Sequence, residues 1–266
     1  MPDTCVVLAR RKRFRSLWRP LFLLSLMAGF CFWVADAASE QYRWQWYRVW
    51  RYVGIWEDGV FTPGVLVEAF GVTLRLVLAS LALALVFGAV MAAMRLCSSP
   101  AARAISALSV GILRNTPLLM QMLAAYFALA PLLNIGPFET AVLVLGSFEG
   151  SYIAEIFRAG AIHVPRSQWE AALSLGMPVG MAARLVVIPQ AVRMILPALV
   201  GQTVSLIKDT SLVSAIAVAD LTMKTRVLIT DTFLSFELWI LAAAIYLVLT
   251  TLVSIPARFF ERKERV

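Results

Sequence analysis

Charged side chains are scarce in this sequence. They make up 15% of its 266 residues, whereas soluble domains carry about 25%. Apolar residues reach 61%, against roughly 45–50% in soluble domains. A soluble domain of this composition could not cover its core with polar side chains, and no polar stretch is long enough to fold into a catalytic domain. The composition therefore predicts an integral membrane protein.

Cysteine and histidine are also rare. The three cysteines, Cys5, Cys31 and Cys97, are odd in number and far apart, and Cys31 lies inside an apolar run. This pattern argues against a disulfide framework. The single histidine, His163, has no neighbouring thiols with which to hold a metal ion. The Cys and His residues therefore do not favour metal chemistry. No G-x-S-x-G sequence occurs either, which argues against an intramembrane enzyme that uses an activated serine.

Positive charge exceeds negative charge, with 24 Lys and Arg residues against 16 Asp and Glu residues and a net charge of +8. In a soluble protein such an excess would suggest nucleic acid binding. Here the basic residues flank the apolar runs, as in proteins that span a lipid bilayer. We therefore expect the chain to contact lipid and to have no nucleic acid partner.

The apolar runs predict an all-α fold, a multi-span transmembrane helix bundle with about six spans. A run of about 20 apolar residues suffices to cross the hydrocarbon core. A polar turn is expected at residues 95–104 and a short interfacial segment at 105–113, before Pro117 starts a new helix. The expected spans are residues 20–38, 76–94, 117–133, 137–156, 185–207 and 233–257.

The N-terminal part differs from the rest. A basic N-terminus, an extra transmembrane helix and an aromatic-rich segment at the outer membrane interface are expected at residues 1–19, 20–38 and 39–63. Ala35-Asp36-Ala37 resembles the cleavage site of a secretory signal peptide, which is the alternative to a permanent helix. The bulky rings of Phe30, Phe32 and Trp33 favour the uncleaved helix.

The distribution of basic residues predicts the orientation. Sixteen of the 24 Lys and Arg residues fall in segments that lie on one side of the expected spans, and such segments are usually cytoplasmic. Both termini, including the basic tail 259–266, are therefore expected in the cytoplasm. The polar loop 159–183 is expected on the same side.

That loop contains the pattern of a short, capped helix. Ser167-Gln168-Trp169-Glu170 fits a capping box, in which Ser caps the first turn and Glu reaches back to the cap residue. A helix is expected over residues 168–175, ended by Gly176 in a left-handed conformation. Pro178 prevents its continuation. The spacing alone does not separate a simple connector from a docking element.

Five motifs, in order, carry a resemblance to a known family. Glu170-Ala171-Ala172, followed by Gly176, Val186 and Pro189, resembles the EAA loop of bacterial ATP-binding-cassette (ABC) importer permeases. The other motifs resemble the polar amino acid branch of that family. They are Arg114-Asn115-Thr116-Pro117-Leu118-Leu119, Ser151 to Arg158, Ile188 to Arg193 with Pro197, and Lys208 to Leu212.

The resemblance covers residues 64–258, which are expected to form the importer transmembrane domain. Ser167 replaces a Gly that is usual in the family, and Val186 replaces an Ile. Residues 1–63 lie outside the common five-span core. The expected location is the bacterial cytoplasmic (inner) membrane.

The resemblance implies a transport subunit rather than an enzyme. Its partners would be a cytoplasmic ABC ATPase dimer, a second permease chain, identical or homologous, and an extracytoplasmic amino-acid-binding protein. ATP and Mg would be bound by the partner ATPase, and this chain would hold no cofactor. The loop would couple ATPase movement to the membrane helices through Ser167, Gln168, Glu170, Ala171, Ala172, Gly176 and Pro189.

Polar groups embedded in the spans are candidates for the substrate path, because charges at such depth usually face a protein interior or a pathway. Glu149 or Glu155 could meet an ammonium group, and Arg114 or Arg193 a carboxylate. Structural ion pairs or caps are the alternative, and residues 208–211 could equally cap a helix at 212–220. The candidates are Arg114, Asn115, Thr116, Pro117, Gln121, Glu149, Tyr152, Glu155, Arg193, Lys208, Asp209, Thr210 and Ser211.

Two other functions fit parts of the pattern. A secondary, ion-coupled transporter also uses broken helices and buried charges, but it normally has an internal repeat, and no convincing repeat occurs here. An ABC permease for another small solute would share the EAA loop but not the amino acid motifs. The sequence leaves open which amino acid is carried and whether the two permease chains are identical.

Overall fold

The structure is a computed structural model that describes residues 25, 26, 28, 29, 42–57 and 59–263. The expected basic N-terminus and most of the expected first span lie outside these residues. Two units form separately, residues 1–47 and 48–266. In the first unit, Trp44 stacks on Trp46 with a centroid distance of 6.0 Å. The second unit holds the helix bundle.

The elements are named here with their bounds. Most are α-helices, η1 and η4 are 3₁₀ turns, and η2 and η3 are π-helical turns. In chain order they are α2 (Trp46–Val49), η1 (Trp50–Tyr52), β1 (Gly54–Glu57), β2 (Val60–Pro63), α3 (Val65–Leu96), α4 (Pro100–Asn115), α5 (Leu118–Ala124), η2 (Ala125–Leu129), α6 (Ala130–Leu133), α7 (Pro137–His163), α8 (Arg166–Ser174), α9 (Val179–Ala182), η3 (Ala183–Val187), α10 (Ile188–Asp209), η4 (Thr210–Ile216), α11 (Leu221–Thr232) and α12 (Ser235–Lys263).

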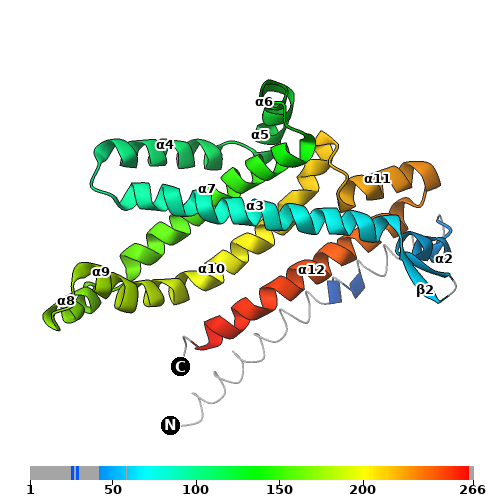
Figure 1. The fold of residues 1–266 in the computed structure, drawn as a ribbon. Helices are drawn as coiled ribbons and strands as arrows, with labels where there is room; N and C mark the ends of the chain where they lie inside the picture. The colour runs from blue at the N-terminus through cyan, green and yellow to red at the C-terminus, as the bar shows by residue number, and fades with distance from the viewer. Residues whose placement is uncertain (1–24, 27, 30–41, 58, 264–266) are drawn as a thin grey trace, which may run out of the picture. The chain divides into compact units, whose positions relative to one another are not determined.

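Within the described residues, four helical runs are long and apolar enough to cross a membrane, which confirms the predicted helix bundle. They are α3, α7, the continuous run Val179–Ile216, and α12 up to Ile255. A fifth span results if α4 and residues 118–133 are counted together across their 102° bend. Figure 1 shows α8 and α9 at one end of α7 and α10, and α11 with the strands at the other end.

A two-stranded hairpin is the one departure from an all-α fold in the described part of the chain. β1 and β2 pair antiparallel, with Trp56 opposite Phe61. Their rings lie 5.6 Å apart between centroids, and both side chains are exposed. The hairpin falls within residues 39–63, where the sequence indicated an aromatic segment but no strand.

Several helices begin or end away from their expected bounds. The polar turn expected at 95–104 is present but shorter, because α3 continues to Leu96 and α4 already begins at Pro100. Ser99 caps α4 by accepting a hydrogen bond from the Ala102 amide at 3.4 Å. The loop expected at 159–183 is shorter, since α7 runs to His163 and α9 begins at Val179. The expected tail is helical as far as Lys263.

The prolines of the fifth span do not break it. The run Val179–Ile216 stays helical throughout, although Pro189 and Pro197 were expected to interrupt it. Pro189 lies in the first turn of α10, where a missing amide hydrogen costs little. The π-helical turn η3 directly precedes it and takes up one extra residue. The change of helix type thus precedes Pro189 alone, whereas Pro197 lies inside the α-helix α10.

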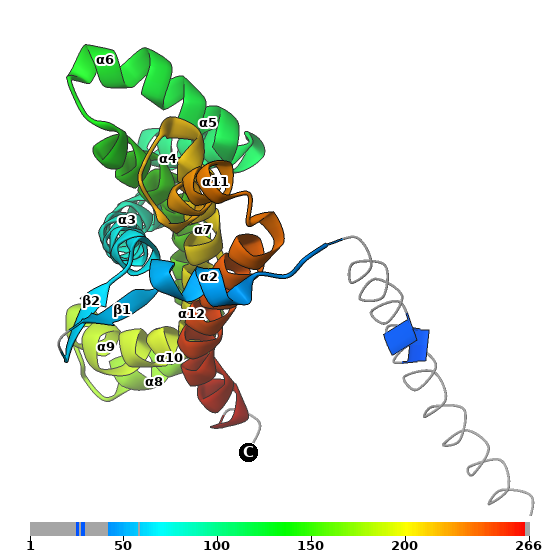
Figure 2. The same ribbon diagram turned by 90° about the vertical axis from the view of Figure 1, so that its right-hand side faces the viewer.

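The core lies where α3, α5, α7, α10 and η4 meet. Leu76, Met122, Leu145, Leu206 and Val213 are fully buried there, one from each of these elements. In Figure 2, α5 and α6 extend from this region away from the rest of the bundle. The core thus joins the region after the Pro117 break to the two central helices.

Small residues bring α3 and α7 into close contact. Gly146 and Gly150 are four residues apart on α7, and Gly88 and Ala84 are four apart on α3. A Cβ atom added at Gly150 would lie 3.0 Å from the Ala84 carbonyl oxygen and 3.2 Å from its Cα. Backbone atoms cannot move aside as side chains do. Such small residues at four-residue spacing let membrane helices approach closely.

We expect Gly150→Val to destabilise the bundle by about 1–3 kcal/mol, the usual cost of overpacking. Thermal unfolding in detergent, followed by tryptophan fluorescence, measures the effect. Gly71→Val is the matched control in α3, because a Cβ atom there meets no atom within 4 Å. Equal melting temperatures for the two variants would contradict the close-contact argument.

Helix α11 is attached to α3 and α12 through a buried polar group. The Asp220 carboxylate accepts hydrogen bonds from the amides of Met223 at 2.8 Å and Thr222 at 3.2 Å, and so caps α11. The Tyr246 hydroxyl donates to it at 3.3 Å. The Leu221 amide donates to Thr73 Oγ1 at 3.0 Å. Asp220 lies between the last two candidate spans, and burial raises the pKa of its carboxyl group above 3.8.

This raised pKa predicts a pH-dependent stability. The folded state binds the Asp220 proton more tightly than the unfolded state, so this stabilisation is fully present below the ordinary pKa of 3.8 and is lost as pH rises through the raised value. Asp220→Asn keeps the cap, because Asn is also a preferred N-cap residue. We expect its melting temperature to fall less than that of the wild type between pH 4 and 7. Parallel profiles in a melting series would show that Asp220 does not contribute.

Candidate functional site

Helix α8 is the short helix expected in the loop, and Gly176 ends it as predicted. Gly176 has a φ of 79°, in the left-handed region. Its amide donates to the Leu173 carbonyl at 2.9 Å, and the Met177 amide donates to the Ala172 carbonyl at 3.3 Å. These bonds satisfy carbonyls that the end of a helix leaves free. The helix is therefore closed sharply at its C-terminal end.

The start of α8 differs from the expected capping box. The helix begins at Arg166, and Pro165 occupies the N-cap position without a side-chain hydrogen bond. Ser167 already lies inside the first turn, so its predicted role as cap is wrong. Glu170 does not reach back either, and its side chain has no hydrogen-bond partner among the described residues. The reason is local, because Pro165 holds an extended conformation that starts the helix early.

The exposed face of α8 contains the acidic residue and apolar side chains. Glu170 and Ala171 are exposed, whereas Ala172 is 3% exposed and packs toward the protein. Leu173 and Leu175 are exposed, Leu175 by 78%. An exposed apolar patch on a short rigid helix is typical of a protein–protein contact. The two alanines therefore face opposite ways, one outward and one inward.

Gln190 links α8 to the membrane-spanning run, and the sequence analysis did not single it out. Its side-chain amide donates to Gln168 Oε1 at 3.1 Å and to the Val186 carbonyl at 2.9 Å. The first bond reaches α8, and the second satisfies a carbonyl of the π-helical turn η3. Pro189 is exposed beside it. In the sequence Gln190 stood within the motif Ile188 to Arg193 but was not among the candidate site residues.

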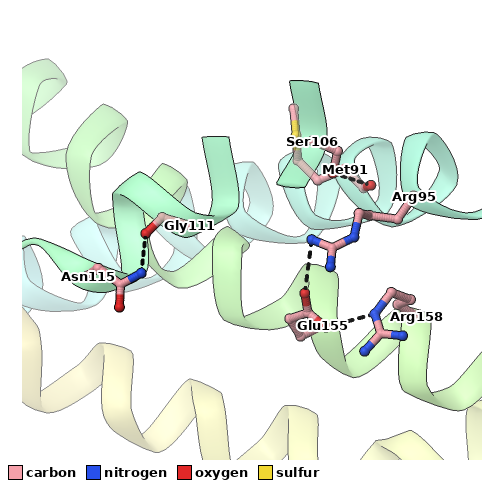
Figure 3. A network of polar contacts seen from close by, with 7 residues as sticks. All are labelled: Met91, Arg95, Ser106, Gly111, Asn115, Glu155 and Arg158. Carbon is pink, nitrogen blue, oxygen red and sulfur yellow. Dashed lines mark hydrogen bonds and ion pairs between the residues drawn. The ribbon is translucent and has the colours of Figure 1, made fainter. Parts of the chain in front are cut away.

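A second polar cluster lies where α3, α4 and α7 meet (Figure 3). Glu155 of α7 pairs with Arg158, three residues further along the same helix, at 2.8 Å. Its other oxygen pairs with Arg95 of α3 at 3.3 Å. Ser106 of α4 donates to the Met91 carbonyl of α3 at 2.8 Å. The cluster borders a polar pocket of about 450 Å³.

The residues after Arg114 hold the bend between α4 and α5. Asn115 donates to the Gly111 carbonyl at 2.8 Å, and Thr116 to the Ile112 carbonyl at 2.9 Å. Gln121 of α5 donates to the Leu113 carbonyl at 2.8 Å and to Thr116 Oγ1 at 2.6 Å. These bonds satisfy the last carbonyls of α4. Pro117 lies at the break itself, as predicted.

Glu149 lies in the interior, between α7 and α10. It is 1% exposed, and it accepts a hydrogen bond from Gln202 of α10. Its Oε1 atom has no hydrogen-bond partner among the described residues. The carboxyl group of Asp209 lies close enough to interact with it. Sequence reasoning missed Gln202, which is 53 residues away along the chain.

The remaining candidates are spread along α10 and η4. Residues 208–211 do not cap a helix at 212–220, because α10 continues directly into η4 and Asp209 makes no capping bond. Thr210 is buried and donates to the Ile207 carbonyl at 2.7 Å. Lys208 and Arg193 are both exposed on α10. Within the described residues, neither Lys208 nor Arg193 forms an ion pair with Glu149 or Glu155.

Tyr152 completes the second cluster. The Arg114 guanidinium lies 4.7 Å from the centroid of its ring. Of the expected path residues, the structure thus joins Arg114, Asn115, Tyr152 and Glu155 around one pocket. Glu149 lies apart from this pocket, buried against Gln202. Arg95 was noted in the sequence only as the residue closing a span, and its partner Glu155 is 60 positions away.

Comparison with known proteins identifies the family of this helix bundle. Residues 84–266 match the family of binding-protein-dependent transport system inner membrane components. The chain belongs to this family. It is therefore a multi-pass permease subunit of the inner membrane, and it is not itself catalytic. In the ABC transporters of this family the partner ATPase carries the ATP.

Individual relatives agree with this assignment. The glutamine transport system permease protein GlnP of Escherichia coli strain K12 is 34% identical over 205 residues, covering 76% of this permease and 94% of the relative. A probable amino-acid ABC transporter permease of Vibrio harveyi, PatM, is 33% identical over 186 residues, covering 68% and 83%. Both relatives are thus matched over most of their own length.

Solved structures show the same fold. A crystal structure of an amino acid ABC transporter with histidines matches with a TM-score of 0.69 at 36% identity, over 75% of this permease and 94% of that chain. An inward-facing MetNI methionine ABC transporter matches with a TM-score of 0.63 over 74% and 95% of the two chains. Its identity is 17%, so that likeness concerns the fold alone.

We expect Gln190→Ala to weaken transport about 2- to 10-fold, because a side-chain hydrogen bond contributes about 0.5–1.5 kcal/mol. The readout is the number of substrate molecules moved per ATP hydrolysed in proteoliposomes. Gln168→Ala removes only the bond shared with Gln190 and should have a smaller effect, and the double variant should transport about as well as Gln190→Ala, because that shared bond is already lost. Additive losses would contradict the proposed link.

Proposed function

We propose that this permease imports polar amino acids, driven by an ABC ATPase. Support comes from the names of its relatives, which include a glutamine permease and a probable amino-acid permease. A structure described as an amino acid transporter shares 36% identity with it, whereas the methionine transporter shares 17%. The four motifs outside the EAA loop point to the same cargo class.

The proposed assembly contains three kinds of subunit. Two permease chains, identical or homologous, form the path at their interface. A cytoplasmic ATPase dimer binds ATP and Mg and contacts α8. An extracytoplasmic binding protein delivers the amino acid. This arrangement follows the family, whose members depend on binding proteins.

Helix α8 is the observation that carries the coupling mechanism. It lies between the ends of two candidate spans, α7 and the run Val179–Ile216, and Gly176 closes it. Its exposed Glu170 and Leu175 offer one charged and one apolar contact to a partner. Because a short closed helix moves as one body, ATPase closure would be passed through Gln190 into α10.

The orientation follows from the same helix. The end of the bundle that carries α8 faces the cytoplasm in this proposal, since the ATPase is there. The excess of basic residues around this end of the spans supports that placement. The opposite end, with α11 and the hairpin, would then face the binding protein, with the aromatic segment at the outer membrane interface.

The proposed substrate path uses the polar residues of α7 and α10. Glu149 and Asp209 lie close together in the interior, and Glu155 lies two turns further along α7. Charged groups at such positions seldom face lipid and usually belong to a protein interior or a pathway. The remaining path candidates named from the sequence stay part of this proposal.

ATP-driven uptake tests the coupling. The permease is reconstituted in proteoliposomes with its ATPase and binding protein, and uptake of radiolabelled glutamine and histidine is measured. Glu170→Lys places a positive charge on the docking face, and Gly176→Val forces a branched side chain into a left-handed conformation. We expect both to reduce uptake by at least about tenfold, equivalent to 1.4 kcal/mol, while the protein still inserts and purifies.

Two matched variants control this experiment. Arg103→Glu reverses an exposed charge on α4, and Gly71→Val adds a side chain in open space on α3. Both should transport like the wild type. Full uptake by Glu170→Lys and Gly176→Val would disprove coupling through α8. Uptake that proceeds without ATP but follows an ion gradient would instead identify a secondary transporter.

A further inference from the structure

The pocket between α3, α4 and α7 has the size and polarity of a small-molecule site. Its volume is about 450 Å³, and its polar lining includes Arg95, Arg114, Asn115, Tyr152 and Glu155. Small-molecule pockets typically measure about 300–1,000 Å³. Three different helices contribute to the walls, so the pocket depends on the folded bundle rather than on one segment.

Positive charge exceeds negative charge around this pocket. Both oxygens of Glu155 are already engaged, one by Arg95 at 3.3 Å and one by Arg158 at 2.8 Å. Arg114 forms no ion pair with any described residue. Two guanidinium groups, those of Arg95 and Arg114, therefore line the pocket with one carboxylate, that of Glu155, and guanidinium groups do not lose their proton. An unbalanced charge in a membrane protein is costly, and a bound anion would compensate it.

Arg114 is held in a conformation that suits an anion. Its guanidinium lies over the ring of Tyr152, 4.7 Å from the centroid. Contact with an aromatic face leaves the N–H edge of the guanidinium available. That edge matches the two oxygens of a carboxylate, with which arginine forms paired hydrogen bonds. The ring therefore orients the donor without consuming it.

The remaining wall of the pocket is open and partly polar. Asn115 uses one N–H of its amide on the Gly111 carbonyl, and a side-chain amide has a second N–H and an oxygen to offer. Gly111 lines the pocket, and a Cβ atom added there would meet no atom within 4 Å. The absence of a side chain at position 111 thus leaves the space free.

We propose that this pocket binds the carboxylate group of the transported amino acid, with Arg114 as the main donor. Arg95 adds positive charge, and Asn115 lies beside the bound group. The proposal rests on the proposed function, because the amino acid cargo supplies the carboxylate. A lipid phosphate is the other anion that could reach a membrane protein, and the experiment below separates the two sources.

Equilibrium binding to the purified permease–ATPase complex, without binding protein, tests the assignment. The probes are tritiated L-glutamine and tritiated L-histidine, with the complex in nanodiscs of neutral phosphatidylcholine. L-glutaminamide, which lacks the carboxylate, serves as competitor. We expect the wild type to prefer glutamine over glutaminamide by at least about tenfold, since hydrogen bonds to charged groups contribute about 1.5–3 kcal/mol.

Three variants localise the binding. Arg114→Gln should weaken glutamine binding about tenfold or more and abolish the preference over glutaminamide, an effect that a merely structural role of Arg114 would not produce. Gly111→Leu should block the pocket while favouring helix formation, because Leu has the higher helix propensity. Gly71→Leu, in open space outside the pocket, should bind like the wild type.

Several results would overturn the proposal. These are equal competition by glutaminamide and glutamine, unchanged binding by Arg114→Gln and Gly111→Leu, and no measurable binding of either probe to the wild type. Binding of phosphatidylglycerol that depends on Arg114, without an effect of amino acids, would assign the pocket to lipid phosphate. ATP-driven uptake by the complete wild-type transporter is measured in parallel. If uptake is present, only the pocket assignment fails; if uptake of both amino acids is absent, the proposed function fails.

Discussion

The close contact of α3 with α7 is the constraint on which the other features depend. Gly88, Gly146 and Gly150 allow the two backbones to approach, and the same two helices then carry Arg95 and Glu155 within reach of each other. Helix α4 packs back along α3 through Ser106, which brings Arg114 over α7. The polar pocket is therefore a consequence of how near α3 and α7 lie. A wider separation would leave the same side chains without partners.

Local features were the ones that the sequence could predict. The helix after Pro165, its end at Gly176, the break at Pro117 and the Glu155–Arg158 pair depend on residues at most a few positions apart. Apolar runs of sufficient length likewise predicted the long helices. In each case the physical cause lies within one or two helical turns, where spacing is known from sequence.

Contacts between distant segments could not be predicted in this way. Gln202 meets Glu149 across 53 positions, and their pairing depends on how α7 and α10 cross. The wrong predictions have causes in neighbouring residues. Ser167 lost its expected capping role because Pro165 starts the helix earlier, and Pro189 did not break its helix because η3 precedes it.

The π-helical turn η3 makes the direction of the loop that carries α8 sensitive to the loss of a single residue. A π-helical turn holds one residue more than the α-helical turn it replaces, and successive residues of an α-helix are rotated by about 100°. The extra residue therefore sets which face of Val179–Ala182 lies toward α8, independently of the side chains that α10 presents. Loss of a single codon within residues 183–187 would remove only one side chain from this long apolar run. It would nevertheless rotate α9 about the helix axis, so that the loop with α8 would point in another direction.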